Sequence, residues 1–156
     1  MTNDIEILAR AVIERRGRFL VARPSGGDYV YLPGGHPEGR EALHACLRRE
    51  LREELGVRAD VGRYLGLIEH GWTDAAGAHQ EVNHCFRVRA SGIGRAPIAR
   101  EPDLEFLWLA PAELGRLNLQ PAPLLRFLRA WPDSSRGGWW ASTAAGRPGG
   151  RFRGGR

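Results

Sequence analysis

The chain has 156 residues, 42% apolar and 26% charged, which suits one globular domain and leaves too little length for two full cores. All 23 basic residues are arginine, and with 18 acidic residues they give a formal net charge of +5. Such an excess alone would favour an anionic partner such as nucleic acid, but it excludes no fold.

The positive charge is unevenly distributed. Residues 1–131 hold 18 arginines and 17 acidic residues, whereas residues 132–156 hold five arginines and one acidic residue. The second segment also contains seven glycines and almost no aliphatic side chains, so it cannot bury enough surface to offset the entropy of ordering it. We therefore predict a domain at 1–131 and a flexible, Gly/Arg-rich tail at 132–156.

Cysteine content and the N-terminal residues indicate the compartment. The two cysteines, Cys46 and Cys85, have no metal-like spacing and are too few for a disulfide framework. The first residues include acids and alternate in polarity, which argues against a signal peptide and a membrane span. We expect a reduced, cytoplasmic protein without a membrane partner.

The first half of the chain predicts a hairpin and a long helix. Residues 5–14 and 18–22 are β-prone, and Gly17 between them can adopt the positive φ of a tight turn. Residues 41–55 contain strong helix formers and no internal Gly or Pro, and Gly56 follows as a helix stop.

The second half alternates between β-prone and helical segments. We expect strands at 61–68, 81–88 and 105–109, then a helical turn at 111–114 and an amphipathic helix at 123–131. A proline stands near the start of each helical segment, where its missing N–H costs little. The order of elements fits an α/β domain with a mixed sheet and differs from a regular βαβ series.

The long helix places carboxylates among its apolar residues. At about 100° per residue, Glu50 and Glu54 fall within the apolar arc and Glu53 lies at its edge. The arc is formed by Leu43, Cys46, Leu47 and Leu51. Inward carboxylates are normally protonated, paired or bound to a metal, and clustered hard oxygen ligands suit Mg²⁺ or Mn²⁺. A solvated acidic helix end is the alternative interpretation.

A longer motif surrounds these glutamates. Gly35 is followed after five residues by Glu41 and, after seven more, by the run Arg49-Glu50-Leu51-Arg52-Glu53-Glu54-Leu55-Gly56-Val57. This pattern resembles the signature of the MutT-like Nudix hydrolases, GX5EX7REUXEEXGU with U a bulky aliphatic residue, and fills every specified position. The resemblance extends over about residues 5–130 and implies the Nudix fold, a mixed β-sheet sandwiched between helices in α/β/α layers.

The resemblance also implies an activity, a metal and ligands. Family members hydrolyse a nucleoside diphosphate linked to a further group, with divalent ions that neutralise and polarise the pyrophosphate. On this basis the Gly35 carbonyl, Glu50, Glu53 and Glu54 are expected to hold Mg²⁺, with Mn²⁺ as the alternative. Glu50 or a loop glutamate is then the general base.

Two further positions of the motif are expected to support the metal ligands. Arg49 is expected to pair with the carboxylates and fix their orientation. Glu41 would hold the loop against the helix or bind an outer ion, and an acid at a helix start also stabilises the helix dipole.

A base outside the motif recurs in the family, and two glutamates are candidates. Glu101 precedes the late strand, and we favour it as an accessory ligand or catalytic base, because such loops can move over a site. Glu81 is the second candidate and also a candidate substrate contact. Glu105 lies in the late strand and is expected to be structural.

The substrate is less closely defined. Arg23 is a candidate phosphate contact, and Tyr31, Trp72 and Phe86 are candidates to stack a base, although strand aromatics more often belong to the core. The marks that distinguish the ADP-ribose, dinucleoside polyphosphate and coenzyme A subgroups are absent here, which favours a (deoxy)nucleoside triphosphate or an oxidised nucleotide. ADP-ribose, a nucleotide sugar and a dinucleoside polyphosphate remain alternatives.

Other functions have weaker support. His70, His79, His84 and Cys85 match no common zinc spacing. The arginines of the tail resemble RNA-binding segments but are few, so we do not expect nucleic acid as a partner. A regulator of the same fold without turnover is a further alternative, and either a monomer or a homodimer is compatible with the sequence.

Overall fold

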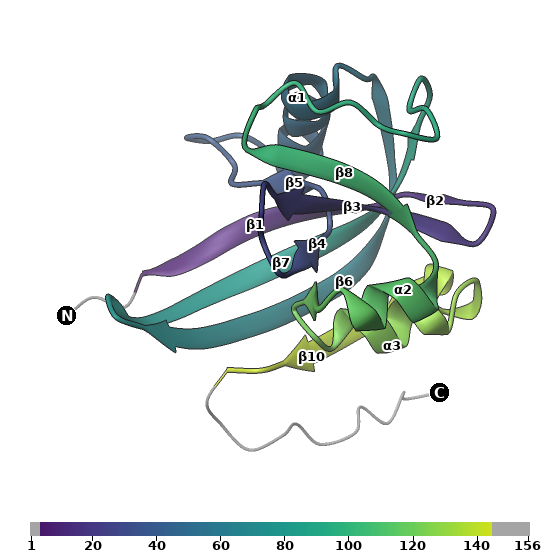
Figure 1. Cartoon of the computed structure of the whole chain (residues 1–156). Helices are drawn as coiled ribbons and strands as arrows, with labels where there is room; N and C mark the ends of the chain where they lie inside the picture. Colours follow the sequence, from purple (N-terminus) through teal and green to yellow (C-terminus); the bar gives the residue numbers. More distant parts are fainter. Residues whose placement is uncertain (1–3, 145–156) are drawn as a thin grey trace.

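Two mixed sheets form the framework of the protein. The computed structural model describes residues 4–144, and Figure 1 shows their arrangement. The first sheet has the order β10 (Trp139–Ser142), β6 (Ala59–Asp74), β7 (Gly77–Ala90), β1 (Ile5–Val12) and β5 (Gly34–Gly35). Within it, β10 lies parallel to β6 and β1 parallel to β7, while the other two pairs are antiparallel.

The second sheet is built around β3 (Arg18–Pro24). It has the order β2 (Glu14–Arg15), β3, β4 (Val30–Tyr31) and β9 (Leu119–Gln120), and β8 (Leu104–Leu109) also pairs with β3. The chain passes from the first sheet to the second at Ile13, so the single mixed sheet expected from the sequence is two mixed sheets.

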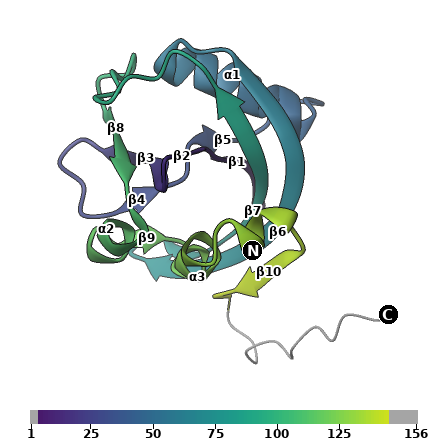
Figure 2. The same ribbon diagram turned by 90° about the vertical axis from the view of Figure 1, so that its right-hand side faces the viewer.

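Helices cover the strands from two sides. Helix α1 (Leu43–Leu55) lies on one side, and α2 (Pro111–Arg116) and α3 (Leu124–Arg129) lie on the other, as Figures 1 and 2 show. A short 3₁₀ helix, η1 (Asp133–Arg136), follows α3. Two buried apolar clusters correspond to these sides: one contains Leu47 and Leu51 of α1, and the other contains Leu114 and Leu128. The α/β/α layering is therefore confirmed.

The N-terminal hairpin differs from the prediction at one residue. The tight turn forms, with φ of 52° at Arg16 and 75° at Gly17. The predicted first strand, however, is interrupted at Ile13, whose carbonyl accepts a hydrogen bond from the Leu20 amide at 3.0 Å. Residues before the interruption join the first sheet, and only β2 pairs with β3.

The helix that carries the motif and the two strands of the long hairpin begin or end at other residues than predicted. Helix α1 begins at Leu43, so Glu41 lies in the preceding loop, and the helix ends at Gly56 with a left-handed φ of 68°. Strands β6 and β7 are longer than expected and leave only a two-residue turn. Between residues 4 and 144, no helix is both long enough and apolar enough to cross a membrane.

The predicted flexible tail is wrong for its first part. Trp139 is only 5% exposed and packs with ring stacking on Phe127 at a centroid distance of 4.7 Å. Gly66, with a φ of 135°, lets the Trp139 backbone approach β6 closely. Burial of Trp139 and pairing of β10 with β6 thus order this segment, although it has almost no aliphatic side chains. The remaining tail, with the arginines considered for RNA binding, lies outside the described residues.

Candidate functional site

Helix α1 orients three glutamates toward the interior of the site to different extents. Glu54 is 7% exposed and Glu50 is largely buried, whereas half of the Glu53 side chain remains in solvent. The exposure of the three side chains differs because helical spacing places each at a different angle from Leu51, which is fully buried. The helix therefore presents a carboxylate row that runs from the core to the surface.

Arg49 connects this row to the preceding loop. Its guanidinium donates hydrogen bonds to both carboxylate oxygens of Glu41, at 3.0 and 2.8 Å, and to Glu50 at 2.8 Å and Glu53 at 3.2 Å. It also donates to the His36 carbonyl at 3.0 Å. These bonds, first those to Glu41, raise the pKa of Arg49 above its usual range. Arg49 therefore fixes the loop and two carboxylates with one side chain.

The backbone at Gly35 lies directly against Glu50. A Cβ at Gly35 would stand 2.6 Å from the Glu50 carboxylate, so a side chain there would have to displace that carboxylate. The preceding glycine, Gly34, has a φ of 140° and its Cβ position overlaps the Ala9 carbonyl. Both glycines allow the loop to bring a backbone carbonyl beside the carboxylate row.

Glu54 is buried without a full set of partners. Its Oε2 atom is inaccessible to solvent and has no hydrogen-bond partner within the described chain. Burial, together with repulsion from Glu50 and Glu101, raises the pKa of Glu54 to about 8, against a smaller opposing effect of Arg10. Glu101 thus lies close enough to act on Glu54, and the neighbouring Arg100 amide donates to the Glu54 carbonyl at 2.7 Å.

The residues present fit a hard divalent cation. Glu54 offers an unpartnered buried oxygen, and Glu50 and Glu53 add carboxylates on the same helix. In residues 4–144, no three His, Cys, Asp or Glu side chains are arranged as a complete metal site, and Arg49 donates hydrogen bonds to Glu50 and Glu53. An open set of oxygen ligands suits an ion whose coordination is completed by phosphate oxygens and water.

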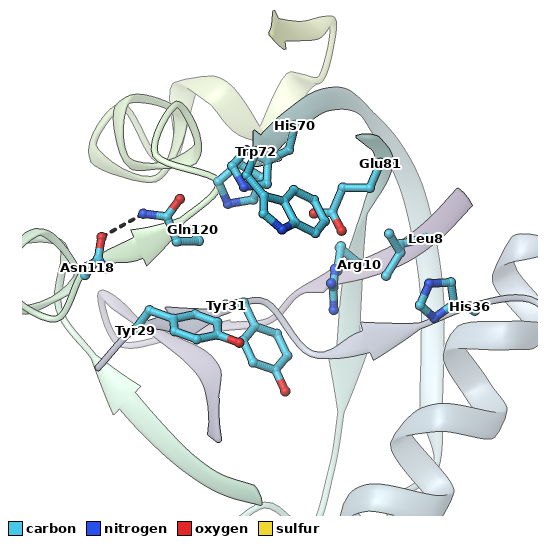
Figure 3. Close-up of a pocket in the computed structure, with 11 residues that line it drawn as sticks. Leu8, Arg10, Tyr29, Tyr31, His36, His70, Trp72, Glu81, Asn118 and Gln120 are labelled. Atoms are coloured by element: carbon cyan, nitrogen blue, oxygen red, sulfur yellow. Dashed lines mark hydrogen bonds between the residues drawn. The ribbon is translucent and has the colours of Figure 1, made fainter. Parts of the chain in front are cut away.

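A cavity of about 640 Å³ lies next to the loop that Arg49 holds: none of the α1 glutamates lines it, but its lining includes His36, whose carbonyl accepts the hydrogen bond from Arg49. Figure 3 shows His70 and Trp72 on one wall and Tyr29 and Tyr31 on the facing wall. The remaining lining residues are Leu8, Arg10, His36, Glu81, Asn118, Gln120 and Pro121. Its volume lies within the usual range of about 300–1,000 Å³ for small-molecule sites.

Tyr31 and Arg10 connect the cavity to the carboxylate row. The Arg10 guanidinium lies 5.2 Å from the centre of the Tyr31 ring. Burial raises the pKa of Tyr31, Arg10 opposes that effect, and Glu54 and Glu101 add to it. Because Tyr31 and His36 both line the cavity and the His36 carbonyl accepts a hydrogen bond from Arg49, the acidic and aromatic parts are adjacent.

Arg10 was not identified from the sequence. Its Nε atom donates to the fully buried Asn83 at 2.9 Å, and Asn83 in turn donates to Glu81 at 2.8 Å. A second bond from Arg10 reaches the Leu32 carbonyl at 3.2 Å. The available signal was an arginine inside the otherwise apolar run at 7–13, since buried cations are normally paired.

The end of the β6–β7 hairpin supplies an aromatic ladder. Trp72 stacks between His70 and His79, at centroid distances of 5.2 and 5.0 Å. His79 is oriented by a 2.8 Å contact with Asp74. Burial lowers the pKa of His70, against a smaller opposing effect of Glu81. The predicted base-stacking candidate Trp72 thus faces the cavity.

Two predicted substrate contacts lie away from the cavity. Arg23 pairs with Glu105 at 2.6 Å, which occupies the guanidinium proposed for phosphate. Phe86 packs against Tyr64, at a centroid distance of 5.1 Å, in the α1 side of the core. Tyr31 and Glu81 do line the cavity, which also includes Asn118 and the β9 residue Gln120, and no sequence pattern indicated these two.

Known proteins are similar to this chain in sequence and in fold. A family model for the NUDIX domain matches residues 6–131. The CTP pyrophosphohydrolase of Escherichia coli (strain K12) is 48% identical over 65 residues, which are 39% of this chain and 47% of that protein. The match therefore spans about half the length of that relative.

Solved structures extend the similarity along the chain. The solution structure of the E. coli ORF135 protein matches with a TM-score of 0.60 and 31% identity, over 81% of this chain and 92% of that one. The crystal structure of a MutT NUDIX hydrolase from Burkholderia pseudomallei matches in fold, with a TM-score of 0.65 and 24% identity over 81% and 97% of the two chains. Because the NUDIX model covers most of the chain and the motif from Gly35 to Val57 is complete, the protein belongs to the MutT-like Nudix hydrolases.

Proposed function

We propose that the protein hydrolyses the pyrophosphate linkage of a nucleoside diphosphate linked to a further group. The observation that carries the proposal is the carboxylate row of α1 beside an aromatic-walled cavity of about 640 Å³. Such a cavity accommodates a nucleoside, and the row supplies oxygen ligands where its phosphates would lie.

The metal ligands proposed are Glu50, Glu53, Glu54 and the Gly35 carbonyl. Nudix hydrolases generally use divalent metal ions, and we propose Mg²⁺, with Mn²⁺ as the alternative. When bound, the ion neutralises phosphate charge and polarises the phosphorus for attack by water. Arg49 contributes by keeping Glu50 and Glu53 in fixed positions, since it donates hydrogen bonds to both.

Two residues are proposed to receive the proton of the attacking water. Glu101 is favoured because it is near enough to Glu54 to raise the pKa of that group, and Glu50 is the alternative. Replacing Glu101 by Gln and measuring turnover at saturating Mg²⁺ tests the first of these, and the same change at Glu81 tests the second candidate outside the motif. A loss below about tenfold at both positions would remove both from the chemistry.

The substrate proposed is a (deoxy)nucleoside triphosphate or an oxidised form. Tyr31, on the wall that faces Trp72, can stack a base, whereas His70 and His79 cover the two faces of the Trp72 ring. Because one relative is a CTP pyrophosphohydrolase, cytidine triphosphates are the first substrates to test. ADP-ribose, nucleotide sugars and dinucleoside polyphosphates complete the panel, each with Mg²⁺ and with Mn²⁺.

A cytoplasmic location stays a prediction, which fractionation of cells that express the tagged chain would test.

The decisive test compares the wild-type protein with Glu53→Gln. The neutral side chain keeps the shape and loses the ligand charge, so turnover is expected to fall by at least about a hundredfold. Glu69→Gln is the matched control, because Glu69 precedes the cavity residue His70 on β6 and its side chain points to the other face. Equal turnover in wild-type protein and Glu53→Gln would contradict the proposal, as would no hydrolysis of any substrate in the panel.

A further inference from the structure

A second cavity, which we call the arginine pocket, lies away from the site described above. Its volume is about 350 Å³, and it is lined by Arg15, Arg16, Arg18, Arg95 and Trp108. It lies at the turn of the β2–β3 hairpin, which projects from the opposite side of the molecule to the tip of the β6–β7 hairpin (Figure 1). None of its lining residues lines the larger cavity.

Two of its arginines are held against each other by the fold. Arg15 of β2 is directly opposite Arg18 of β3 in the strand register. Like charges in that position are destabilising, so the pairing has a cost that apolar or opposite charges would avoid. The Glu113 carboxylate forms an ion pair with the Arg18 guanidinium at 2.8 Å. No carboxylate between residues 4 and 144 lies within 4.0 Å of the Arg15 guanidinium.

Trp108 and a neighbouring loop make the floor of the arginine pocket rigid. The Arg15 guanidinium lies 4.7 Å from the centre of the Trp108 ring and donates to the Ile93 carbonyl at 2.6 Å. The Trp108 indole N–H donates to the Gly94 carbonyl at 2.8 Å. These contacts fix one cation and one ring before any ligand binds.

The rim of the pocket carries uncompensated positive charge. Arg16 and Arg95 are exposed, and in the part of the chain that the structure describes neither is paired with a carboxylate. The two nearby acids have other partners: Glu14 accepts a hydrogen bond from the Gly17 amide at 2.6 Å, and Glu113 accepts from the Ala110 amide at 2.7 Å. The pocket therefore has free donors for an anion.

We propose that the arginine pocket binds a di- or oligophosphate anion, at a site separate from the catalytic one. Guanidinium groups match phosphate oxygens in geometry and charge, and the volume suits a small anion. Since Arg15 covers one face of Trp108, the pocket offers little surface for stacking a base, so recognition rests on the phosphates alone. This inference does not depend on the proposed hydrolysis.

The test is calorimetric titration of the intact protein with inorganic pyrophosphate in a metal chelator. Without a metal, the acidic site repels the probe, which isolates the arginine pocket and leaves the outcome independent of turnover. Wild-type protein is expected to bind with a Kd below about 1 mM. Arg16→Gln combined with Arg95→Gln is expected to weaken binding at least about tenfold, because each lost charged donor removes a phosphate contact.

The control removes the same charge elsewhere. Arg48→Gln with Arg58→Gln changes two exposed arginines outside the pocket and is expected to leave the affinity within about twofold. Equal weakening by both pairs would reduce the effect to net charge and overturn the proposal, as would no binding by the wild-type protein.

Further ligands identify the source of the phosphate. ADP is expected to bind about as well as pyrophosphate, because the pocket does not recognise the base. Arginine-dependent binding of a single-stranded RNA oligonucleotide, with no binding of pyrophosphate, would identify a nucleic-acid contact and refute the proposal.

Discussion

Glu54 shows how one carboxyl group can link the site to the stability of the fold. Its pKa of about 8 exceeds the ordinary value of 4.5 because burial disfavours the charged form. Without a metal, the folded protein therefore binds more protons than the unfolded chain between these two values. The stability that Glu54 contributes is complete below pH 4.5 and is lost as the pH rises through 8.

We expect the free energy of unfolding to depend on pH, and we expect the substitution Glu54→Gln to weaken that dependence. In chelator, the wild-type protein should lose on the order of a few kcal/mol of unfolding free energy between pH 5 and pH 8.5, whereas Glu54→Gln should lose much less. Thermal unfolding monitored by circular dichroism at each pH measures this. Glu69→Gln serves as the control with the wild-type slope, and identical slopes for wild-type protein and Glu54→Gln would show that Glu54 is already ionised.

At the same scale, the sequence predicted residues whose environment depends on local spacing. Glu50 and Glu54 face inward because helical geometry fixes their direction relative to Leu47 and Leu51. Arg10 was missed because its partner, Asn83, is 73 residues away and the strand pairing that joins them is not readable locally. Arg23 was misplaced for the same reason, since its partner Glu105 lies on β8.

Among the elements, the loop with β5 has the most direct effect on the site. A methyl group at Gly35 would meet only the flexible end of Glu50, so Gly35→Ala should displace the carboxylate and leave the fold intact. Turnover is expected to fall about 10- to 100-fold, because small displacements of reacting groups have large kinetic effects. Steady-state kinetics and the melting temperature, measured on the same sample, separate the two effects.

Gly94→Ala provides the comparison for this prediction. At Gly94 the nearest atom to an added Cβ is 3.9 Å away, so neither turnover nor stability should change. Unchanged turnover in Gly35→Ala would mean that the loop relaxes without moving Glu50. A large loss of stability would mean that the backbone itself cannot accept the methyl group.

Element type was readable from the sequence where segments were long. Helix α1 and its end at Gly56 follow from composition and a single glycine. Strands β4, β5 and β9 contain two residues each, too few for any periodicity to indicate them. The interruption at Ile13 depends on a choice between two sheets, which only the packed molecule determines.

For the whole molecule, the C-terminal strand is part of the folded unit. Thr143 donates to the Glu69 carbonyl at 2.9 Å, and its hydroxyl contacts the cavity residue His70 at 2.7 Å. A chain that ends at residue 131, the domain boundary expected from composition, would lose these bonds and the burial of Trp139. The sequence did not indicate this because tryptophan, rather than aliphatic residues, provides the packing.

Truncation tests that assignment. A chain ending at residue 131 is expected to melt about 10 °C below a chain ending at residue 144, because burial of a tryptophan contributes about 3–5 kcal/mol. Calorimetry of both chains gives the difference. Equal melting temperatures would show that η1 and β10 add nothing to the core.

The position of β10 also has a consequence for synthesis in the cell. The contact between His70 and Thr143 joins residues 73 positions apart, so β6 leaves the ribosome well before the strand that covers its edge. At about 5–20 residues per second, that edge stays uncovered for roughly 4–15 seconds. During this interval the nascent chain exposes unpaired backbone groups to other chains, so its risk of aggregation is highest just before the last strand is made.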